Sequence, residues 1–316
     1  MRILIVRTSS LGDLVHMLPA ISDIVAHVPN AQIDWLVEES FADIPTWHPG
    51  VDQAIVVAHR RWRRNWWSEQ TQNERRALRK RLAAERYDIV LDMQALMKSA
   101  WLVRQTHGTR HGLDWKSARE PLASLFYDVR HRVAFWQPAV IRQRQLAEQT
   151  FGYRATGAPD FGLSRFEGVQ REAPYVVIMP SASRDDKLWP AGDWREVMHR
   201  LRRDGLTLKV LAGNAAETQR AQALIEGIEG AQVMPRMGLT EVMHILAGAT
   251  IMVGLDSGLT HLSAALGRPT IGIYKASTPV RTPLTGSGLN FSMGDRGASP
   301  SLNAVLAAVD QALAAA

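Results

Sequence analysis

The sequence predicts an α/β protein built from two doubly wound, Rossmann-like domains that face a cleft. Short apolar runs typical of strands alternate with helix-like stretches along the chain, which is the pattern of parallel βαβ units with helices on both faces of each sheet. This alternation stops over one weakly patterned stretch and then restarts. The length of 316 residues also exceeds the usual size of a single domain.

We expect the first domain to span residues 1–155. Apolar runs predict strands at 2–7, 32–37, 54–57 and 88–92, and helix-like segments fall near 12–28, 69–85, 95–106 and 138–151. The first strand runs into RTSSLGDL, a Ser/Gly loop that opens a helix. This loop has too few glycines for a dinucleotide loop and lacks the Gly-Lys-Ser/Thr of a P-loop. It carries Asp13 where a phosphate would sit, so we expect it to face something other than a nucleotide.

We expect residues 156–173, which contain three Gly and one Pro, to be a linker, and residues 174–316 to form the second domain. Strands are predicted at 175–180, 207–212, 250–256 and 269–274. Helices are predicted from Pro190 and near 215–227, 239–247 and 258–266. An Ala-rich helix over about 303–316 ends the chain, and packing back on the first domain is one option for it. Ligands of such sheets bind beyond the carboxyl ends of the strands.

Composition argues against a membrane-spanning protein, and the distribution of charge points to an anionic partner. The chain has no cysteine, and no apolar stretch approaches the roughly 18 residues of a membrane span, so we expect a cytoplasmic protein. Residues 1–154 hold 22 Lys/Arg against 16 Asp/Glu, whereas residues 155–316 hold 15 of each. The formal net charge of +6 therefore lies in the first half. Within it, residues 59–81 contain nine basic and two acidic residues, a field that attracts lipid headgroups, phosphorylated sugars or nucleic acid.

The most informative stretch of the second half is LDSGLTHLSAALGRPTIGIY, residues 255–274. A strand ends at Asp256, Ser257 and Gly258 form the turn, and a helix opens with its free N–H groups facing the crevice. That arrangement binds a diphosphate. An isolated Asp-Ser-Gly is more often an ordinary helix cap. Thr260 and His261 on the first turn favour a ligand site.

Two further loops follow strands of the second half. In SASRDDKLWP (181–190), Lys187 can neutralise a phosphate leaving group while Ser181 and Ser183 donate hydrogen bonds, although a solvated charged loop would show the same residues. The spaced Asp-x-Asp of metal-dependent sugar transferases is absent, so we expect no metal. In AGNAAETQR (212–220), Glu217 is placed to hold ribose hydroxyls or simply to favour the first turn of a helix. His107-x-x-x-His111 has metal-ligand spacing, but we interpret its segment as a Gly/Arg loop.

Together these stretches resemble the nucleotide-sugar half of the GT-B glycosyltransferases. The chain is most similar to the lipopolysaccharide heptosyltransferases, and among them to the type I members. The resemblance runs over nearly the whole chain, through MRILIVRTSSLGDLVHMLPAI, IDWLVEESFADIPTWHP, RRWRRNWW, DWKSAREPLASLFY, SRDDKLWP and DSGLTHLSAAL. It implies metal-independent transfer of heptose, with inversion and without a cofactor, from ADP-L-glycero-β-D-manno-heptose to the inner Kdo of Kdo2-lipid A. It also implies a peripheral protein on the cytoplasmic face of the inner membrane.

The resemblance implies roles for individual residues on the donor side. Lys187 would contact the departing diphosphate and so also act in catalysis. The donor-binding residues it implies are Ser183, Lys187, Glu217, Met237, Asp256, Ser257, Gly258 and His261. Ser257 replaces the usual Thr of the family but keeps the hydroxyl, and Ala182 stands where some members have a second hydroxyl. Lys275-Ala276-Ser277 replaces the familiar Gly-Pro-Thr, so the contacts there depart from the family pattern.

On the acceptor side, Asp13 is the expected general base, because an inverting displacement needs a carboxylate to take the proton of the acceptor hydroxyl. The band RRWRRNWW interleaves tryptophans, which favour membrane interfaces, with arginines, which pair with phosphates and carboxylates. The acceptor-binding residues we expect are Arg60, Arg61, Arg63, Arg64, Lys98, Arg119 and Glu120.

Three other functions are compatible with parts of the sequence. A type II heptosyltransferase would act later in the core. A sugar-nucleotide 2-epimerase of the same fold would share the nucleotide half but would not need a basic, Trp-rich first domain. A nucleic-acid-binding protein would show basic residues with aromatic interleaving, yet it would not need a neutral second domain with three crevice motifs.

Overall fold

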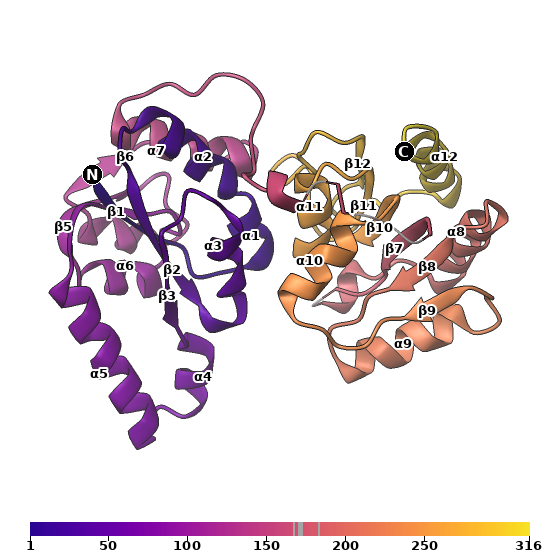
Figure 1. Ribbon diagram of the computed structural model, residues 1–316, viewed down its shortest axis with the longest axis horizontal. Coiled ribbons are helices and arrows are strands. Elements are labelled where there is room, and N and C mark those ends of the chain that lie inside the picture. Colours follow the sequence, from indigo (N-terminus) through magenta and orange to yellow (C-terminus); the bar gives the residue numbers. More distant parts are fainter. Residues whose placement is uncertain (167, 170–172, 183) are drawn as a thin grey trace. The chain divides into compact units, whose positions relative to one another are not determined.

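The computed structural model describes residues 1–166, 168–169, 173–182 and 184–316 (Figure 1). The chain divides into two compact units, Met1–Gly162 and Leu163–Ala316, so the division falls inside the stretch expected to be a linker. Each unit carries a six-stranded parallel sheet with helices packed around it. The prediction of two doubly wound α/β units is confirmed.

The sheet of the first unit has the strand order β3-β2-β1-β4-β5-β6. Its strands are β1 (Arg2–Val6), β2 (Gln32–Glu38), β3 (Gln53–Val57), β4 (Arg86–Asp92), β5 (His107–Leu113) and β6 (Val129–His131). The strand order reverses between β1 and β4. In sheets of this kind the ligand crevice opens beyond the carboxyl ends of the strands at such a reversal. The loop after β1, which contains Asp13, lies at this point.

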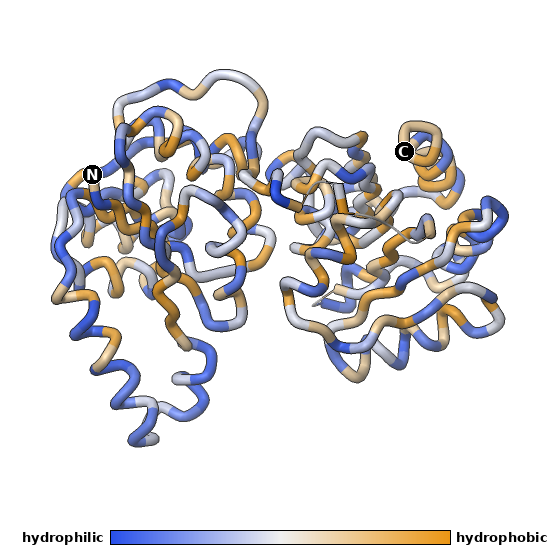
Figure 2. The backbone as a smooth tube through the Cα atoms, viewed as in Figure 1, coloured by the Kyte–Doolittle hydropathy of each residue, from blue (hydrophilic) through white to orange (hydrophobic). Residues whose placement is uncertain are grey.

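The helices of the first unit are α1 (Leu11–Val15), α2 (Leu18–His27), η1 (Glu39–Phe41), α3 (Asp43–Trp47), α4 (His59–Arg64), α5 (Glu69–Ala84), α6 (Met97–Val103), η2 (Pro121–Phe126) and α7 (Ala139–Phe151). They include the helices predicted near 69–85, 95–106 and 138–151, together with short helices that were not expected, namely η1, α3, α4 and η2. The single helix expected over 12–28 is wrong, because the chain forms α1 and α2 instead. Pro19 is the second residue of α2 and has no amide hydrogen to continue the ladder from α1. Figure 2 shows the apolar strands inside the unit and the largely hydrophilic α5.

The second unit repeats the same topology, with the strand order β12-β11-β10-β7-β8-β9. Its strands are β7 (Tyr175–Met179), β8 (Thr207–Val210), β9 (Ala231–Val233), β10 (Ile251–Leu255), β11 (Thr270–Tyr274) and β12 (Asn290–Gly294). The order reverses between β7 and β10, so the loops after these two strands meet at the crevice. These are the loops that carry Lys187 and Asp256.

The helices of the second unit are η3 (Ser164–Phe166), η4 (Asp185–Lys187), α8 (Ala191–Arg203), α9 (Ala215–Ile225), α10 (Leu239–Ala247), α11 (Gly258–Ala265) and α12 (Leu302–Ala314). The C-terminal helix α12 buries Val305, Ala308, Val309 and Ala312 in the core of its own unit, against α8 and strands β10 to β12. Across the described ranges of the chain, no helix combines the length and apolarity needed to cross a bilayer.

Strands β5, β6, β9 and β12 were not expected, and the interpretation of residues 107–111 as a loop is wrong. The segment HGTRHGL of β5 is too polar to stand out as a strand, yet it pairs with β4 on one side and with β6 on the other. His111 does not form a metal pair with His107. Its Nδ1 lies 2.9 Å from Nε2 of His131, with the two rings stacked and buried.

Candidate active site

Asp13 is held by the loop that follows β1. It lies in the first turn of α1, where its Oδ2 accepts hydrogen bonds from the amide of Ser10 at 3.0 Å and from the Ser10 hydroxyl at 2.8 Å. The side chain is 40% exposed. Asp13 therefore caps its helix and still presents carboxylate surface at the carboxyl edge of the sheet.

An arginine of the same loop pairs with this carboxylate. Nη2 of Arg7 lies 3.0 Å from Oδ1 of Asp13, and the arginine side chain is only 9% exposed. The guanidinium also donates to the main-chain carbonyl of Met93, which fixes its position. Partial burial alone would raise the pKa of Asp13, but the Arg7 charge and the Ser10 hydrogen bonds outweigh it and lower the pKa to about 2. Asp13 is thus an ionised acceptor of hydrogen bonds at neutral pH.

The loop after β4 locks the Asp13 loop in place. The Gln94 side-chain oxygen accepts from the amide and hydroxyl of Thr8, at 3.0 and 2.9 Å. Gln94 is itself held by Asp92, whose Oδ1 accepts from its amide at 2.9 Å. Asp92 is fully buried, and its Oδ2 accepts from the Tyr127 hydroxyl at 2.8 Å. A chain of hydrogen bonds therefore runs from the buried Tyr127 to the loop that carries Asp13.

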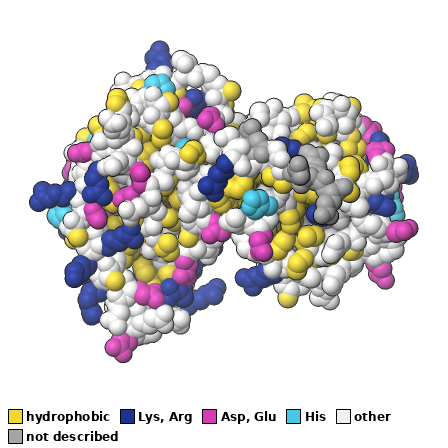
Figure 3. All heavy atoms as spheres, viewed as in Figure 1, with side chains coloured by type: hydrophobic (Ala, Val, Ile, Leu, Met, Phe, Trp, Pro, Cys, Tyr) yellow, Lys and Arg dark blue, Asp and Glu magenta, His cyan; other side chains and the backbone are white. Residues whose placement is uncertain are grey.

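A basic pocket opens beside this loop and has a volume of about 450 Å³. Three of the predicted acceptor residues line it, namely Arg60, Arg63 and Lys98. Other lining residues are Ser9, Glu38, Trp62, Trp66, Arg75, Arg79 and Trp101. Lys and Arg side chains gather over α4 and α5 in Figure 3. The pocket combines cations with indole rings, so it suits an anionic ligand that also has an apolar or sugar face.

Lys98 links the pocket to the Asp13 loop. Its Nζ donates to the Ser9 hydroxyl at 2.9 Å. Burial and the Arg60 charge lower the pKa of Lys98, and the carboxylates of Glu38, Asp13 and Glu120 oppose that shift. Lys98 therefore interacts electrostatically with both Arg60 in the basic pocket and Asp13 in the neighbouring loop.

The structure does not bring the other predicted acceptor residues into the lining of this pocket. Arg61 turns to the opposite side of α4, where it forms ion pairs of 3.0 Å with Glu39 and 2.9 Å with Glu74. Glu120 accepts from the Met97 amide at 2.6 Å and thereby caps α6. Arg64 and Arg119 are exposed. Arg61 thus braces α4 against α5, and the acceptor contacts expected of Arg61, Arg64, Arg119 and Glu120 stay predictions.

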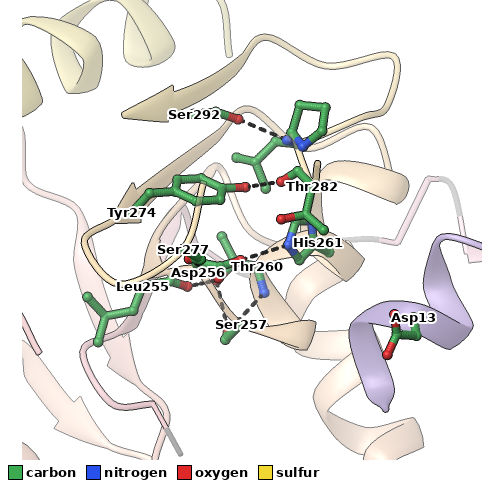
Figure 4. Close-up of polar contacts among 12 residues, drawn as sticks. Asp13, Leu255, Asp256, Ser257, Thr260, His261, Tyr274, Ser277, Thr282 and Ser292 are labelled. Atoms are coloured by element: carbon green, nitrogen blue, oxygen red, sulfur yellow. Dashed lines mark hydrogen bonds and ion pairs between the residues drawn. The ribbon is translucent and has the colours of Figure 1, made fainter. Parts of the chain in front are cut away.

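In the second unit, the Asp256 carboxylate organises the crevice (Figure 4). Oδ2 accepts from Nζ of Lys187 at 2.7 Å and from the Ser277 hydroxyl at 2.5 Å, while Oδ1 lies 3.0 Å from Nε2 of His261. Lys187 also donates to the main-chain carbonyl of Asp256 at 2.9 Å. Burial alone would raise the pKa of Asp256, but hydrogen bonds from His261, Lys187 and Ser277 hold it well below its ordinary value. Both oxygens are engaged, so Asp256 positions its neighbours.

The N-terminus of α11 completes this edge. Ser257 is the N-cap, with its side chain accepting from the Thr260 amide at 3.4 Å, and Gly258 is the first helical residue. The Thr260 hydroxyl donates to the Leu255 carbonyl at 2.6 Å and so ties the helix to the end of β10. First-turn amides and a nearby ammonium, here that of Lys187, are the kinds of group that attract a diphosphate, so diphosphate binding at this edge stays a prediction.

The remaining predicted donor residues lie on neighbouring loops. The Glu217 carboxylate accepts from the Gly213 amide and from the Asn214 side chain, each at 2.7 Å. It is buried in the first turn of α9, the position that the alternative interpretation of the sequence gave it, while its ribose contact stays a prediction. Met237 is half-buried in the loop before α10. Ser183 lies outside the described residues.

Comparison with known proteins identifies the family. Residues 75–308 match Glycosyltransferase family 9 (heptosyltransferase), which covers well over half of the chain. The chain belongs to this family. The family 9 assignment confirms the resemblance inferred from the sequence and makes the protein a glycosyltransferase.

Individual members of family 9 match closely. Lipopolysaccharide heptosyltransferase 1 of Salmonella typhimurium (strain LT2) is 46% identical over 284 residues, which span 88% of this chain and 90% of the relative. The structure of E. coli heptosyltransferase WaaC with ADP matches 99% of this chain and 100% of that chain at 41% identity, with a TM-score of 0.93. The structure of E. coli heptosyltransferase WaaC with ADP-2-deoxy-2-fluoro heptose matches 98% of this chain and 99% of that chain, also at 41% identity, with a TM-score of 0.89. The GT-B fold is confirmed.

Sequence reasoning missed parts of this family 9 site. Arg7 directly follows the first strand, and a basic residue in that position was the signal that could have pointed to a partner for Asp13. Ser277 was treated only as a departure from the family pattern, yet it binds the Asp256 carboxylate. Trp101, in the helix-like segment predicted near 95–106, was not among the residues expected at the site. It lines the basic pocket.

Proposed function

We propose that this protein transfers L-glycero-D-manno-heptose from ADP-heptose to the inner Kdo of Kdo2-lipid A, with inversion, in the biosynthesis of the lipopolysaccharide inner core. The observation that carries this proposal is that the two sheets hold different kinds of reactive group at their carboxyl edges. One carboxyl edge holds an ionised carboxylate beside a basic pocket, and the other holds a lysine beside a helix N-terminus. The two sites supply the base and the anion-binding groups that an inverting transfer needs.

The donor binds in the second unit in this proposal. The diphosphate receives hydrogen bonds from the first turn of α11 and the charge of Lys187, and Asp256 keeps that lysine aimed at the crevice. Glu217 and Met237 hold the nucleoside, and His261 borders the sugar. The relatives support this, because WaaC binds ADP and ADP-2-deoxy-2-fluoro heptose.

The acceptor binds in the first unit in the same proposal. Arg60, Arg63 and Lys98 pair with its phosphates and carboxylates. The acceptor hydroxyl points at the free part of the Asp13 carboxylate. Relatives named lipopolysaccharide heptosyltransferase 1 support an acceptor of this class.

The reaction is one displacement. The acceptor oxygen forms a bond to the anomeric carbon while the bond from that carbon to the diphosphate oxygen breaks, and ADP leaves with the electron pair. The proton of the hydroxyl passes to Asp13. A carboxylate with a pKa of about 2 is a weak base, so it takes the proton late, once the forming bond has made the hydroxyl acidic. Lys187 and the α11 amides stabilise the charge that grows on ADP.

No metal or cofactor takes part in this proposal. Among the described residues, no three His, Asp or Glu side chains are grouped as they would need to be to hold a metal ion. We expect EDTA to leave the rate unchanged, because Lys187 and the α11 amides already supply positive groups for the diphosphate. A rate that falls with EDTA and returns with added Mg²⁺ would contradict this part of the proposal.

Mass spectrometry of the acceptor tests the proposed function. Wild-type enzyme with ADP-heptose should convert Kdo2-lipid A to the singly heptosylated product and should leave an acceptor that already carries this heptose unchanged. The reverse preference would favour a type II enzyme. A thermal-shift panel tests for a sugar-nucleotide epimerase or a nucleic-acid-binding protein, because ADP should stabilise the proposed transferase whereas UDP-sugars and RNA should not.

A further inference from the structure

Helix α6 carries an apolar stripe that faces away from the core. Met97 and Trp101 are four residues apart, which places them on one face of the helix, and their exposed fractions are 37% and 52%. Ala100 and Val103, on other positions of the same helix, are fully buried. The helix is thus apolar on both sides, and only one side is covered within this unit.

The neighbouring element η2 repeats this arrangement. It packs against α6, and its residues Leu122 and Leu125 are 53% and 61% exposed while Ala123 and Ser124 are buried. In a 3₁₀ helix, side chains three residues apart lie above one another. The two leucines therefore form a second apolar ridge. We call Met97, Trp101, Leu122 and Leu125 the α6–η2 patch.

The charges around this patch are cationic. Lys98, Arg104 and Arg119 are exposed on its two elements or next to them, and the Arg104 guanidinium lies 5.6 Å from the centre of the Trp101 ring. The nearby carboxylates are engaged. Glu120 caps α6, and Asp128 pairs with Arg110 at 2.5 Å. An apolar surface with indole and cations at its border is complementary to the anionic headgroups and upper acyl region of a bilayer.

We infer that the α6–η2 patch inserts into the surface of a bilayer that contains anionic phospholipid. This inference rests on the proposed function, because it supplies a way to reach an acceptor held in a membrane. Lys98 lies on α6 and donates to Ser9 in the Asp13 loop, so the patch and the base belong to adjoining parts of the unit. A lipid anchored beneath the patch would present its sugar end to that loop.

Vesicle sedimentation tests the patch. The variant Leu122→Ser/Leu125→Ser removes apolar surface from exposed positions that line neither the basic pocket nor the Asp13 loop. Its partition onto vesicles of phosphatidylcholine with phosphatidylglycerol should fall about tenfold or more relative to wild type, since membrane affinity scales with the apolar area inserted. The matched control Val280→Ser/Leu289→Ser changes two exposed apolar residues of the second unit and should bind like wild type. Circular dichroism confirms that each variant is folded.

Two further arms separate this inference from the proposed function. Turnover of a water-soluble, deacylated acceptor should be the same for the leucine variant and wild type. If wild type turns over no acceptor, the proposed function fails, while the vesicle assay still tests the patch. Unchanged vesicle binding by the leucine variant would overturn the inference. If the leucine variant kept its vesicle binding but lost a dimer that wild type forms in analytical ultracentrifugation, the patch would instead be an interface with a second copy of the chain.

Discussion

Arg7 and Asp13 form an ion pair in which Nη2 of the arginine lies 3.0 Å from Oδ1 of the aspartate, at the carboxyl end of the first strand. The arginine is nearly buried and is fixed by the Met93 carbonyl, whereas the aspartate side chain is 40% exposed. The pair sets the charge of the proposed base. It also gives a pH dependence whose sign follows from the structure.

Replacing Arg7 should change the acid limb of the pH–rate profile. The pKa of Asp13 is depressed to about 2, so the carboxylate is ionised throughout the working range. Arg7→Gln removes the attractive charge and should raise this pKa by about one to two units. Ionised Asp13 then disappears at a higher pH, and kcat/KM should begin to fall near a pH of about 4, where wild type is still flat.

Arg7→Lys is the control, because it keeps the charge and should restore most of the wild-type profile. Rates are measured only where circular dichroism shows folded protein. Identical acid limbs for Arg7→Gln and wild type would mean that Arg7 does not set the protonation of the base.

Lys187 is predicted to bind the donor diphosphate. Lys187→Ala should weaken ADP binding by calorimetry by roughly tenfold to a hundredfold, since hydrogen bonds to charged groups contribute about 1.5–3 kcal/mol. It should also lower kcat, because the charge on ADP grows as it leaves. Lys80→Ala, on the exposed α5 helix, is the matched control. If ADP affinity and rate both survive the loss of Lys187, its only function is to pair with Asp256.

The arginines of α4 should separate into two kinds of residue. Arg60→Gln/Arg63→Gln removes two cations from the basic pocket, so the acceptor KM should rise and its salt dependence should flatten, while the donor KM stays unchanged. Arg61→Gln breaks the pairs with Glu39 and Glu74. It should leave the salt slope as in wild type and lower the melting temperature slightly. Equal effects of both variants on acceptor KM would restore the simpler picture of one continuous band.

Tyr127 is predicted to stabilise the fold through Asp92. Tyr127→Phe removes a hydrogen bond to a fully buried carboxylate and should cost about 1–3 kcal/mol of unfolding free energy in urea titrations. Tyr274→Phe removes a hydrogen bond of 2.6 Å to the main-chain carbonyl of Thr282, a neutral acceptor, and should cost only about 0.5–1.5 kcal/mol. A Tyr127 variant as stable as the Tyr274 variant would show that Asp92 does not depend on this hydroxyl.

The sequence predicted the central strands and missed those with polar or short segments. The runs RILIV and IMVGL are buried on both faces and stand out as apolar stretches. The β5 segment HGTRHGL carries no such pattern, and only its pairing with β4 and β6 makes it a strand. The helix over 12–28 was predicted as continuous because its apolar spacing runs through Pro19, whose missing amide became decisive only in the folded chain.

Sequence alone could place those site residues that directly follow a predicted strand. Asp13 after β1 and Asp256 after β10 follow strand ends, so their place at a crevice could be inferred from the chain. Pairings between separate loops could not. Lys187 and Asp256 are 69 residues apart, and only the sheet order brings β7 beside β10. The ion pairs of Arg61 with Glu39 and Glu74 could not be inferred either, because these two carboxylates lie on other elements.

The most direct test of the proposed mechanism is the Asp13→Asn variant, with kcat and donor affinity measured separately. Asparagine keeps the size of the side chain but cannot accept the proton, so kcat should fall by roughly 10²–10⁴. ADP affinity should stay at the wild-type value, because the donor site belongs to the other unit. Asp193→Asn, in the first turn of α8, is the matched control and should leave both quantities unchanged. Near-normal turnover by Asp13→Asn would contradict the assignment of Asp13 as the base.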